Sequence, residues 1–480
     1  MSIGVDVNIA QAVEYAIHHG YQVSPNAIKL LKSAGEKLEG PSSLDFLSVI
    51  SLLIEEKGKF VASTESARNV PTITDQDLIG FLPKVFENTV IMTNSELASK
   101  EESDIEVIFD PSVSVEQSMI GTFALLFRSR YEKFLRIFGE RPEARQLTKI
   151  SEQDMGQGVS RISGLVLSKR ASKFGIELTL DDTVGKLNVV AMSDDSRKAA
   201  SDIMLDQGIM VEVVSKSRRL AIKSLVQPDL PIRVPVGSHK DVYAIFLSDL
   251  HIGSNRFLAS SFSRFLEWVN GRGLGNSDDG YILSHLKYVI IAGDIVDGVG
   301  VFPNQEYELA ETDILKQYVM VAEKLKEVPD RLAVVVIPGN HDSTRQALPQ
   351  PRISAKYAEP VYQLRNVTML GDPCVVRLSG VSVLVYHGRS LDDVLATTAS
   401  TSYNRPAEAM KILLKARHLA PMFGSRTPIA PESEDRLVIE DPPDIFHAGH
   451  VHTIGVESYR GTLILNSGTW QAQTSYQANL

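Results

Sequence analysis

The spacing of hydrophobic positions changes several times along this 480-residue chain, and each change predicts a different kind of element. Near the N-terminus, apolar residues recur at helical intervals, and Ser24-Pro25 has the pattern of a helix cap followed by a first-turn proline. We therefore expect residues 1–57 to form a small helical unit. Residues 58–115 have only short apolar pieces among frequent Ser, Thr and Glu, which predicts a poorly ordered linker.

A strongly amphipathic helix is predicted over residues 119–138, within a helical connection that spans 116–157. Its aromatic residues fall on one stripe with basic residues beside them, which is typical of a core-facing helix with a solvated basic face. The aromatic positions are Phe123, Phe127, Tyr131, Phe134 and Phe138.

Short β-like runs replace the helical pattern in residues 158–235. Five such runs with one helical stretch near residues 198–205 predict an OB-type barrel. Barrels of this type bind single-stranded nucleic acid or serve as protein-contact modules. The segment is mildly basic, but Phe174 is its only aromatic residue, so it has little capacity for base stacking. We favour a scaffold role for it.

Residues 240–480 alternate between buried-strand patterns and helical stretches, which predicts a four-layer α/β sandwich with functional side chains on the loops after the strands. The fold class of the whole chain is therefore predicted as multi-domain α/β, with the helical unit, the barrel and the sandwich in that order. The predicted strands of the sandwich are Tyr243–Leu247, Val289–Ala292, Ala333–Ile337, Val381–Tyr386, Ile445–Ala448 and Leu463–Asn466.

The charge of the chain limits how it could hold nucleic acid. Its net charge is −10, whereas a protein that binds nucleic acid mainly through its own surface is usually basic. A nucleic-acid role would therefore depend on a local patch, a metal site or a partner. The single cysteine, Cys374, excludes an intramolecular disulfide and a cysteine-built zinc site. With no signal-peptide pattern and no apolar run of about 18 residues, we expect a cytoplasmic protein without a membrane partner.

Four short polar strings in residues 240–480 each follow an apolar, mostly β-branched run and contain Asp, Asn or His. Taken singly, each has a structural explanation, because Gly-Asp is a common turn pair and a histidine after a strand is usually a hydrogen-bonded structural residue. Together they predict a site for two divalent metals. The strings are Asp249-Leu250-His251, Gly293-Asp294 with Asp297, Gly339-Asn340-His341-Asp342 and Gly449-His450-Val451-His452, with His387 between the third and the fourth.

The spacing within these strings suggests how the ligands would converge. Residues two apart on an extended segment face the same side, so Asp249 and His251 could share one metal, and His450 and His452 could approach from one side. Asp294 follows a buried strand, where a lone carboxylate is unfavourable without a cation, and it is the natural bridge between two ions. Mixed imidazole and carboxylate ligands suit Mn, Fe or Zn better than Mg, and we expect manganese.

Further side chains near these strings have candidate roles. His341 follows a predicted ligand and could act as a general acid or stabilise charge on a leaving oxygen. Arg345 and Arg389 are candidates for phosphate contact, because a guanidinium matches the geometry of phosphate. His447 precedes the last string by three residues, and we expect it to support the ligands from behind or to have a plain structural role.

The order of these strings resembles the calcineurin-like phosphoesterase superfamily. More narrowly, the chain resembles the small subunits of archaeal family-D DNA polymerases over most of residues 120–478. The strings that carry this resemblance are FLSDLHIGS (246–254), AGDIVDGVG (292–300), IPGNHDSTRQALPQP (337–351), YHGRSLDD (386–393), HLAPMFGSRTPIAPE (418–432), DIFHAGHVHT (444–453) and NSGTWQAQTSYQ (466–477).

The resemblance implies an OB domain ahead of a phosphoesterase domain that acts as a 3′→5′ exonuclease on single-stranded DNA 3′ ends. It also implies a partner, the large catalytic subunit for which this activity proofreads. It places catalytic help at His341 and two metal ions at Asp249, His251, Asp294, Asn340, His387, His450 and His452. The alternatives are a stand-alone phosphomonoesterase or cyclic-nucleotide phosphodiesterase, and a non-catalytic scaffold of the polymerase.

Overall fold

The computed structural model describes residues 13, 16–17, 21–29, 72–73, 104–111, 121–141, 147–150, 159–216, 219–272, 277–398 and 401–473. The chain divides into two compact units. One comprises residues 1–99 and 263–285, and the other comprises residues 100–262 and 286–480. Among the described residues, no helix combines the length and the apolar character that a membrane crossing needs.

The first unit contains a small parallel sheet of β1 (Gln22–Val23) and β2 (Thr72–Ile73), and the helix α9 (Ser277–His285). The Ser24 hydroxyl accepts a hydrogen bond from the Ala27 amide at 3.1 Å. Ser24 therefore caps the helical residues that start at Pro25, as the sequence predicts. Most of the helical unit predicted over residues 1–57 lies outside the described residues.

The predicted five-stranded barrel with one helix is confirmed. Its strands are hydrogen-bonded in the order β4-β5-β6-β8-β7, and pairing of β4 with β7 closes the barrel. The core is formed by buried aliphatic residues such as Ile162, Val189 and Val211. Its elements are β4 (Val159–Ser172), β5 (Gly175–Asp181), β6 (Lys186–Ala191), α7 (Asp194–Ser201), β7 (Gly208–Lys216) and β8 (Arg219–Val226).

The helix α7 begins about four residues earlier than predicted. Ser193 caps it by accepting a hydrogen bond from the Ser196 amide, and the Ser196 hydroxyl accepts one from the Ser193 amide in return. This reciprocal cap satisfies two amides at the start of the helix. The boundary is therefore set by a serine pair that the apolar spacing does not reveal.

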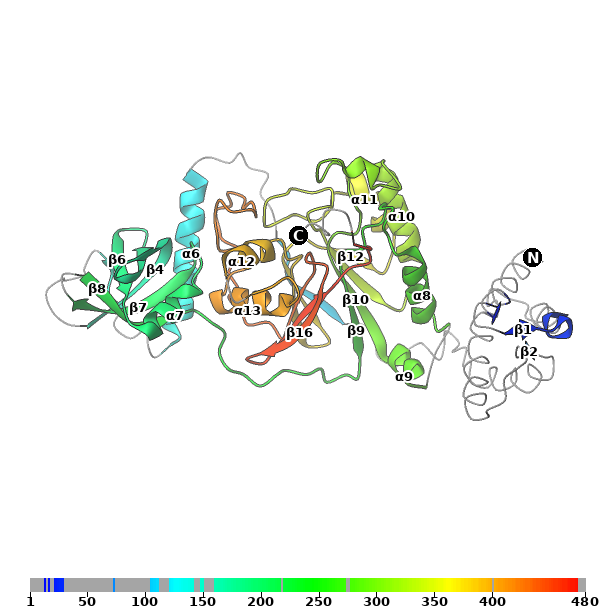
Figure 1. Ribbon diagram of the computed structural model, residues 1–480, viewed down its shortest axis with the longest axis horizontal. Helices are drawn as coiled ribbons and strands as arrows, with labels where there is room; N and C mark the ends of the chain where they lie inside the picture. The colour runs from blue at the N-terminus through cyan, green and yellow to red at the C-terminus, as the bar shows by residue number, and fades with distance from the viewer. Residues whose placement is uncertain are drawn as a thin grey trace. The chain divides into compact units, whose positions relative to one another are not determined.

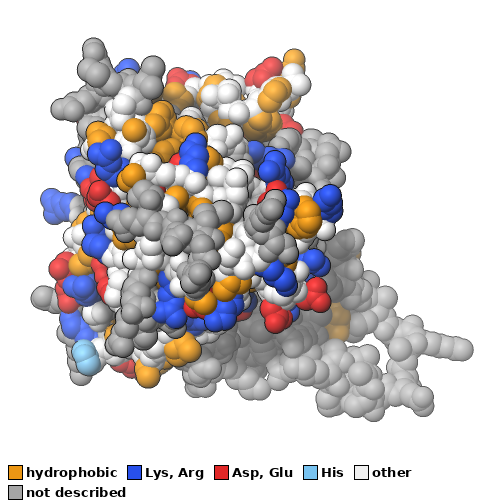
Figure 2. All heavy atoms as spheres, turned by 90° about the vertical axis from the view of Figure 1, so that its left-hand side faces the viewer, with side chains coloured by type: hydrophobic (Ala, Val, Ile, Leu, Met, Phe, Trp, Pro, Cys, Tyr) orange, Lys and Arg blue, Asp and Glu red, His pale blue; other side chains and the backbone are white. Residues whose placement is uncertain are grey.

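The surface of the barrel does not present a uniform basic face. Figure 2 views the structure from the side on which the barrel lies in Figure 1, and Lys and Arg side chains there are interspersed with acidic and hydrophobic ones. The ring of Phe174 is covered by the Arg219 guanidinium, 4.0 Å from the ring centroid. The one aromatic ring of the barrel is thus already stacked, which favours the scaffold role.

Two sheets with helices beside them make up the rest of the second unit, which we call the two-sheet domain (Figure 1). One sheet has four parallel strands in the order β12-β11-β10-β9, and the other has six strands in the order β16-β17-β15-β14-β13-β3. The strands are β3 (Ile105–Phe109), β9 (Tyr243–Leu247), β10 (Leu286–Ala292), β11 (Ala333–Ile337), β12 (Val367–Met369), β13 (Cys374–Leu378), β14 (Val381–Val385), β15 (Ile445–Ala448), β16 (Ile454–Tyr459) and β17 (Thr462–Ser467).

The two sheets pack face to face through a shared apolar core. Ile290 and Val335 of the smaller sheet lie in one cluster with Val376 and Val383 of the larger sheet. Helices α12 and α13 cover the opposite face of the larger sheet, and α10 and α11 lie on the other side of the domain (Figure 1). The remaining elements are a 3₁₀ turn at Gln305–Tyr307, α10 (Ile314–Lys326), α11 (Ala355–Tyr362), α12 (Leu391–Thr397) and α13 (Pro406–Ala416). The boundary between the two units falls within α8 (Ala259–Val269), between residues 262 and 263.

The strand β3 lies inside the segment that the sequence predicts to be a poorly ordered linker. It pairs with β13 in antiparallel fashion at the edge of the six-stranded sheet. The Tyr288 hydroxyl also accepts a hydrogen bond from the Asp104 amide at 2.8 Å. The prediction of a linker is therefore wrong for residues 105–109. Edge strands are half exposed and short, so their apolar signal is weak.

Helix α6 (Gly121–Gly139) connects the barrel to the two-sheet domain. Its fully buried Arg130 donates Nε–H to Asp435 at 2.6 Å and Nη1–H to the Pro421 carbonyl at 2.7 Å, both in the two-sheet domain. The same Nη1 also contacts the Asp206 carbonyl of the barrel at 3.2 Å. One buried cation thus bonds to both domains.

Asp435 also accepts a hydrogen bond from His418. The Ala420 amide donates to Nδ1 of His418, so Nε2 carries the proton and donates to Asp435 at 3.0 Å. This imidazole is neutral, because burial and the nearby Arg130 cation lower its pKa to about 4. The cluster of Arg130, Asp435 and His418 therefore holds one positive and one negative charge.

Removing the carboxylate from this cluster should destabilise the second unit strongly. We expect Asp435→Ala to lower the free energy of unfolding by about 3–5 kcal/mol, because the Arg130 cation would remain buried and unpaired. Urea denaturation followed by circular dichroism measures this. Glu106→Ala, which breaks the exposed Glu106–Arg377 pair, is the matched control and should lower it by at most about 1 kcal/mol. Equal effects of the two substitutions would contradict the role of Asp435.

The neutral state of His418 predicts a dependence of stability on pH. The folded pKa is about 4 and the unfolded value is about 6.5, so between these values the unfolded chain binds a proton that the folded chain excludes. The contribution of His418 is therefore present above about pH 6.5 and is lost as the pH falls towards 4, with a limiting slope of about 1.4 kcal/mol per pH unit. His418→Gln should flatten this slope in urea titrations. If the free energy of unfolding depends on pH with the same slope in variant and parent, His418 does not cause this dependence.

Candidate metal centre

The four polar strings and His387 all follow the carboxyl ends of strands. Asp249, Asp294 and Asn340 come directly after β9, β10 and β11, which run parallel in the four-stranded sheet. His387 and His450 follow β14 and β15, which are parallel neighbours in the other sheet. The carboxyl ends of parallel strands meet at one edge of a sheet, so both sheets deliver these side chains to a common edge.

Three of the four strings have left-handed rather than extended backbone at predicted ligands. Asp249, His251 and Asp294 have φ values of 52°, 50° and 52°, and His450 and His452 have values of 71° and 55°. Residues other than glycine adopt this region rarely and at an energetic cost, and such strain is commonly found at functional sites. The alternation rule used in the sequence analysis therefore does not apply here, and each side chain is aimed by its own turn.

Glycines make room for the carboxylates in two of the strings. A Cβ atom at Gly339 would lie 2.2 Å from Oδ1 of Asp294, and one at Gly449 would lie 2.3 Å from Oδ2 of Asp249. Any larger residue at either position would displace the carboxylate. Glycine is thus required before Asn340 and before His450 for a steric reason, whether or not those two residues bind a metal.

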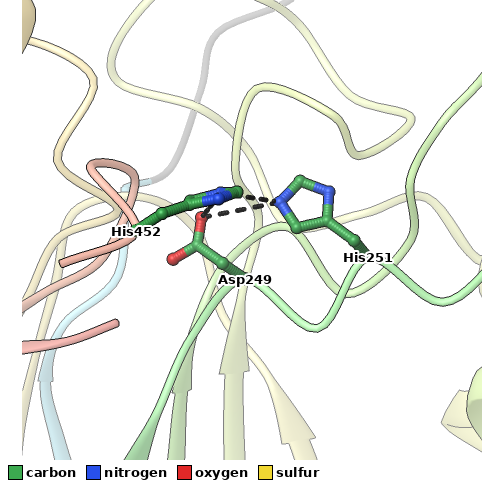
Figure 3. A group of neighbouring side chains, drawn as sticks. All are labelled: Asp249, His251 and His452. Carbon is green, nitrogen blue, oxygen red and sulfur yellow. Dashed lines mark hydrogen bonds and ion pairs between the residues drawn. The ribbon is translucent and has the colours of Figure 1, made fainter. Parts of the chain in front are cut away.

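Asp249, His251 and His452 form one group of converging side chains (Figure 3). The Nε2 atoms of the two imidazoles are 3.0 Å apart, and Oδ1 of Asp249 lies 3.4 Å from Nε2 of His452 and 3.8 Å from Nε2 of His251. This buried oxygen accepts no hydrogen bond within the described part of the chain.

Asp294, Asn340 and His387 form a second group beside the first. Oδ2 of Asp294 lies 3.3 Å from Nε2 of His387 and 3.9 Å from Nε2 of His251, so one carboxylate faces both groups. The amide oxygen of Asn340 is 2.9 Å from Nε2 of His387. Asp294 therefore lies where a bridging ligand is expected from the sequence.

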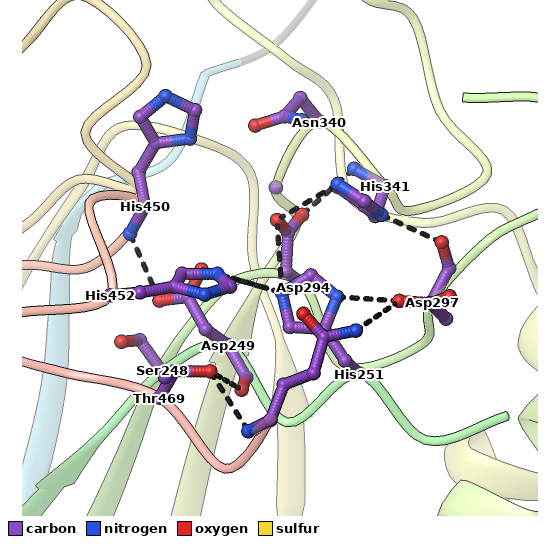
Figure 4. Close-up of polar contacts among 12 residues, drawn as sticks. Ser248, Asp249, His251, Asp294, Asp297, Asn340, His341, His450, His452 and Thr469 are labelled. Carbon is purple, nitrogen blue, oxygen red and sulfur yellow. Dashed lines mark hydrogen bonds and ion pairs between the residues drawn. The ribbon is translucent and has the colours of Figure 1, made fainter. Parts of the chain in front are cut away.

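The ring of His450 lies beside the second group, but its Nε2 does not face the centre (Figure 4). The His450 amide donates to Oδ2 of Asp249 at 2.9 Å, and its ring packs edge-on against the His387 ring, with the centroids 5.1 Å apart. Nε2 of His450 lies 3.1 Å from Oδ2 of Asp392 in helix α12. The structure thus brings the seven predicted ligands close together, with the ring of the seventh held by Asp392.

The charges of the cluster balance through its imidazoles. Burial favours the neutral acid, but His387 and His341 hold the pKa of Asp294 well below its usual value. Burial likewise favours a neutral His387, yet Asp294 and Asp249 raise its pKa to about 10. Burial also favours a neutral His251, but Asp297 and Asp294 raise its pKa as well. Protonated imidazoles therefore serve as the cations of this cluster, and metal ions would take their place with release of protons.

The geometry of the first group fits a divalent cation. Two nitrogens bound side by side to one cation lie about 3 Å apart, because each metal–nitrogen distance is about 2.1 Å. The facing Nε2 atoms of His251 and His452 match this spacing, and Oδ1 of Asp249 supplies a buried anionic oxygen without a hydrogen bond. These residues could hold a metal ion.

Two of the imidazoles are aimed by contacts behind them. Nδ1 of His387 donates to the Ala292 carbonyl at 2.9 Å, and Nδ1 of His251 lies 3.0 Å from Oδ1 of Asp297. Each contact leaves Nε2 facing the centre, as ligating histidines require. Asp297 is itself buried and accepts a hydrogen bond from Gln471 at 2.9 Å.

His341 faces the same centre from the side of Asp297. Its Nδ1 donates to the Asp297 carbonyl, 2.6 Å away, and its Nε2 lies 4.0 Å from Oδ2 of Asp294 (Figure 4). Burial lowers the pKa of this imidazole, so the free ring is neutral with its proton on Nδ1. Nε2 is then available to hold or pass a proton at the centre.

The structure separates the two arginines that were candidates for phosphate contact. Arg389 lines the cleft described below and donates to the carbonyl and side-chain oxygens of Gln346. Arg345 forms an ion pair with Glu432 at 2.8 Å and donates to the carbonyls of Ala347 and Pro349. These contacts engage the Arg345 guanidinium within its own loop, so we do not assign it to phosphate binding.

His447 does not contact a predicted ligand directly. It is fully buried, its Nε2 lies 3.0 Å from Oγ of Ser467, and that hydroxyl lies 2.8 Å from the hydroxyl of Ser248. Burial lowers the pKa of this imidazole to about 3, so the ring is neutral. Hydrogen bonds through Ser467 therefore connect His447 to Ser248, the residue before Asp249.

Two carboxylates near the centre have no role in the prediction from sequence. Asp372 accepts the His387 amide at 3.0 Å, and Asp392 faces the His450 ring. Burial raises the pKa of Asp372 to about 7. Asp392 lies within the YHGRSLDD string that carries the family resemblance. Its partner His450 is 58 residues away in the sequence, so the string alone does not reveal their contact.

A cleft of about 960 Å³ opens over the centre. His251, Asp294, Asn340 and His341 line its floor, and Phe302, Tyr403, Arg389 and Arg426 are among the other lining residues.

Comparisons with known proteins agree with the resemblance found in the sequence. Residues 244–453 match the family model for the B subunits of DNA polymerases alpha and epsilon. The chain is similar to the DNA polymerase II small subunit of Archaeoglobus fulgidus, with 41% identity over 363 residues that cover 75% of this chain and 72% of the relative. The proteins of the same name from Pyrococcus furiosus and Methanothermobacter thermautotrophicus are 38% and 37% identical, over 82% and 79% of this chain and 67% and 79% of the relatives. The chain therefore belongs to the family of DNA polymerase II small subunits, the small subunits of archaeal family-D DNA polymerase.

Proposed function

We propose that the chain is a phosphodiesterase with two divalent metals that removes nucleotides from single-stranded DNA 3′ ends. The observation that carries the proposal is the convergence of two ligand groups on Asp294, with Nε2 of His341 facing the same carboxylate. In this role it would be the proofreading exonuclease of a DNA polymerase.

We assign the two-sheet domain to the metallophosphoesterase sandwich predicted over residues 240–480. Two facing sheets with helices on their outer sides support this assignment. We assign the barrel to the OB type predicted over residues 158–235, on the basis of its strand order. The strand β3 is added to the sandwich from outside the predicted bounds.

Asp249, His251 and His452 would hold one ion, Asn340 and His387 the other, and Asp294 both. His450 would join the second group if its ring turned away from Asp392. Two bound cations would activate water and offset the negative charge on the phosphate oxygens. Manganese fits the mixture of nitrogen and oxygen ligands, as do iron and zinc.

His341 would move the proton that the reaction needs. A phosphate in the cleft brings negative charge next to the ring, which favours its protonated form and places the second proton on Nε2. Water attacks the phosphorus of the terminal phosphodiester and gives up one proton to the solvent. The bond to the penultimate 3′ oxygen breaks, and Nε2 of the protonated ring passes its proton to that oxygen. The products are a 5′-mononucleotide and a strand that is shorter by one residue.

The lining of the cleft supports DNA over a small phosphate ester. The aromatic rings of Phe302 and Tyr403 offer surfaces for a base, and two arginines offer contacts to phosphate. The relatives bear the name DNA polymerase II small subunit, which also favours a DNA substrate. A phosphomonoesterase or cyclic-nucleotide phosphodiesterase is the second candidate, and a non-catalytic scaffold is the third.

We further propose a large polymerase subunit as the partner, since the relatives are named small subunits. The net charge of −10 implies weak affinity for DNA when the chain is alone. The partner would then raise the rate of DNA degradation by bringing the 3′ end to the cleft.

The function is tested by comparing the parent chain with His341→Ala on a labelled single strand in the presence of manganese, with and without the large subunit. We expect the parent to release 5′-mononucleotides and the variant to lose at least about 100-fold in rate, because proton transfer contributes 10²- to 10⁴-fold. The variant should keep its fold and its binding of DNA ends.

Small phosphate esters serve as the competing substrates in the same assay. Faster turnover of these esters than of the strand would favour the second candidate. Hydrolysis of neither substrate by a manganese-loaded chain would establish the scaffold. Undiminished cleavage by His341→Ala would refute the role given to His341.

The steric role of Gly449 gives an independent test of the metal centre. We expect Gly449→Ala to weaken manganese binding by about 10- to 100-fold, because its Cβ would displace the Asp249 carboxylate. Isothermal titration calorimetry measures the affinity. Gly237→Ala is the matched control, since a Cβ there meets no atom within 4 Å, and it should bind manganese like the parent. Equal affinities of all three proteins would argue against this centre.

A further inference from the structure

The rim of the cleft carries an arginine that has no role in the prediction from sequence. Arg426 is exposed and lines the cleft together with Arg389. Arg389 donates through Nη1 to two oxygens of Gln346. The guanidinium of Arg426 forms no hydrogen bond or ion pair with another described residue, although its charge helps to lower the pKa of Asp392. Its donors are therefore available to a ligand in the cleft.

The backbone at Arg426 is held firmly by a buried carboxylate. Asp393 in helix α12 accepts hydrogen bonds from the Ser425 hydroxyl at 2.7 Å, the Arg426 amide at 2.9 Å and the Thr427 amide at 3.1 Å. Asp393 is only 3% exposed, so these charge-assisted bonds have little competition from water. The loop on which Arg426 lies is thus fixed on one side.

Phe423 anchors the same loop on its other side. Its ring packs edge-on against Phe123 and Phe127 of helix α6, at centroid distances of 4.9 and 5.5 Å. Its amide donates to Oδ2 of Asp206 in the barrel at 3.0 Å. Arg426 therefore projects from a loop that contacts α6, α12 and the barrel, and a guanidinium presented in this way loses little backbone entropy when it binds a ligand.

Stability does not account for this arrangement, because an exposed cation that forms no ion pair contributes little to the free energy of unfolding. A guanidinium beside a phosphodiesterase centre matches a phosphate by geometry and by charge. The charge of Arg426 acts on Asp392, whose carboxylate faces the His450 ring and not the Asp294 carboxylate. We therefore place the guanidinium to one side of the two ligand groups, where it would meet a phosphate next to the one that is cleaved. A polymer has such a second phosphate, and a small ester does not.

We propose that Arg426 binds a backbone phosphate of the DNA strand other than the scissile one, and thereby makes the cleft select a strand over a small ester. This inference rests on the proposed function, since it takes DNA to be the substrate. Asp393 is the residue that positions Arg426.

The test compares Arg426→Ala, Arg426→Lys and Arg365→Ala with the parent in the full chain. The substrates are a labelled single strand and the small diester bis(p-nitrophenyl) phosphate, both with manganese. Arg426→Ala should lower kcat/KM for the strand about tenfold relative to kcat/KM for the small diester, mainly through KM. Arg365 is exposed and lies outside the lining of the cleft, so Arg365→Ala should match the parent on both substrates.

Binding gives a readout that does not depend on cleavage. With His341→Ala as the background, the slope of log affinity for the strand against log salt concentration should fall by about 0.7 when Arg426 is replaced by Ala, because one phosphate contact is lost. Arg426→Lys should restore the slope, since the charge returns, but only part of the affinity, since the paired hydrogen bonds do not.

The outcomes separate this inference from the proposed function. If the parent degrades the strand and Arg426→Ala changes neither KM nor the salt slope, the role of Arg426 is overturned and the proposed function stands. An equal loss on both substrates would indicate a structural role and also overturn it. If the parent cleaves no strand, the proposed function fails, and the salt slope of strand binding still decides whether Arg426 contacts phosphate.

Discussion

Two buried carboxylates determine which side chains lie at the edge of the two-sheet domain where the predicted ligands meet. Asp249 and Asp294 are at most 1% exposed, and each lies at the end of a strand of the same parallel sheet. Isolated negative charges are strongly unfavourable at such depth, so cationic groups must surround them. The imidazoles of His251 and His387, whose pKa values the carboxylates raise, are the groups that do so, and they come from both sheets. The face-to-face packing of the sheets is what allows this.

The strained turns follow from the same requirement. Ligands delivered by short loops from parallel strands point outward from the sheet edge, and left-handed backbone at Asp249 and Asp294 redirects them inward. Gly339 and Gly449 leave the space into which the carboxylates turn. Strain and lost side chains are tolerated here because the strands behind them, such as β10, are fully buried and mostly apolar and supply the stability.

The central strands were predictable from the sequence because continuous β-branched runs between turns permit few other structures. The peripheral strand β3 was missed because half-exposed edges alternate too weakly to stand out. The polar strings predicted that these side chains converge for a similar reason, since their residue types have few joint explanations. What the strings could not give is the direction of each side chain. His450 and His452 are two residues apart, yet their rings diverge because each residue has its own left-handed turn.

Side-chain partners distant in the sequence were also beyond prediction. Arg345 and Arg389 were equivalent candidates by residue type, and tertiary contacts such as the ion pair of Arg345 with Glu432, 87 positions later, separate them. The same holds for Arg426, whose place at the cleft depends on Asp393 and on the aromatic residues of α6. Local patterns identify chemistry, whereas the choice among chemically equal residues is made by tertiary contacts.

The hydrogen bonds of Arg130 to the barrel and to the two-sheet domain limit how these two domains can change in evolution. The loop between Pro421 and Thr427 is bonded to the barrel, to α6 and to α12, and it forms part of the wall of the cleft. Exchanging the barrel for an unrelated module would remove Asp206 and disturb the wall, even though the barrel supplies none of the lining residues. The two domains are therefore constrained to be inherited and to diverge together, as a single evolutionary unit.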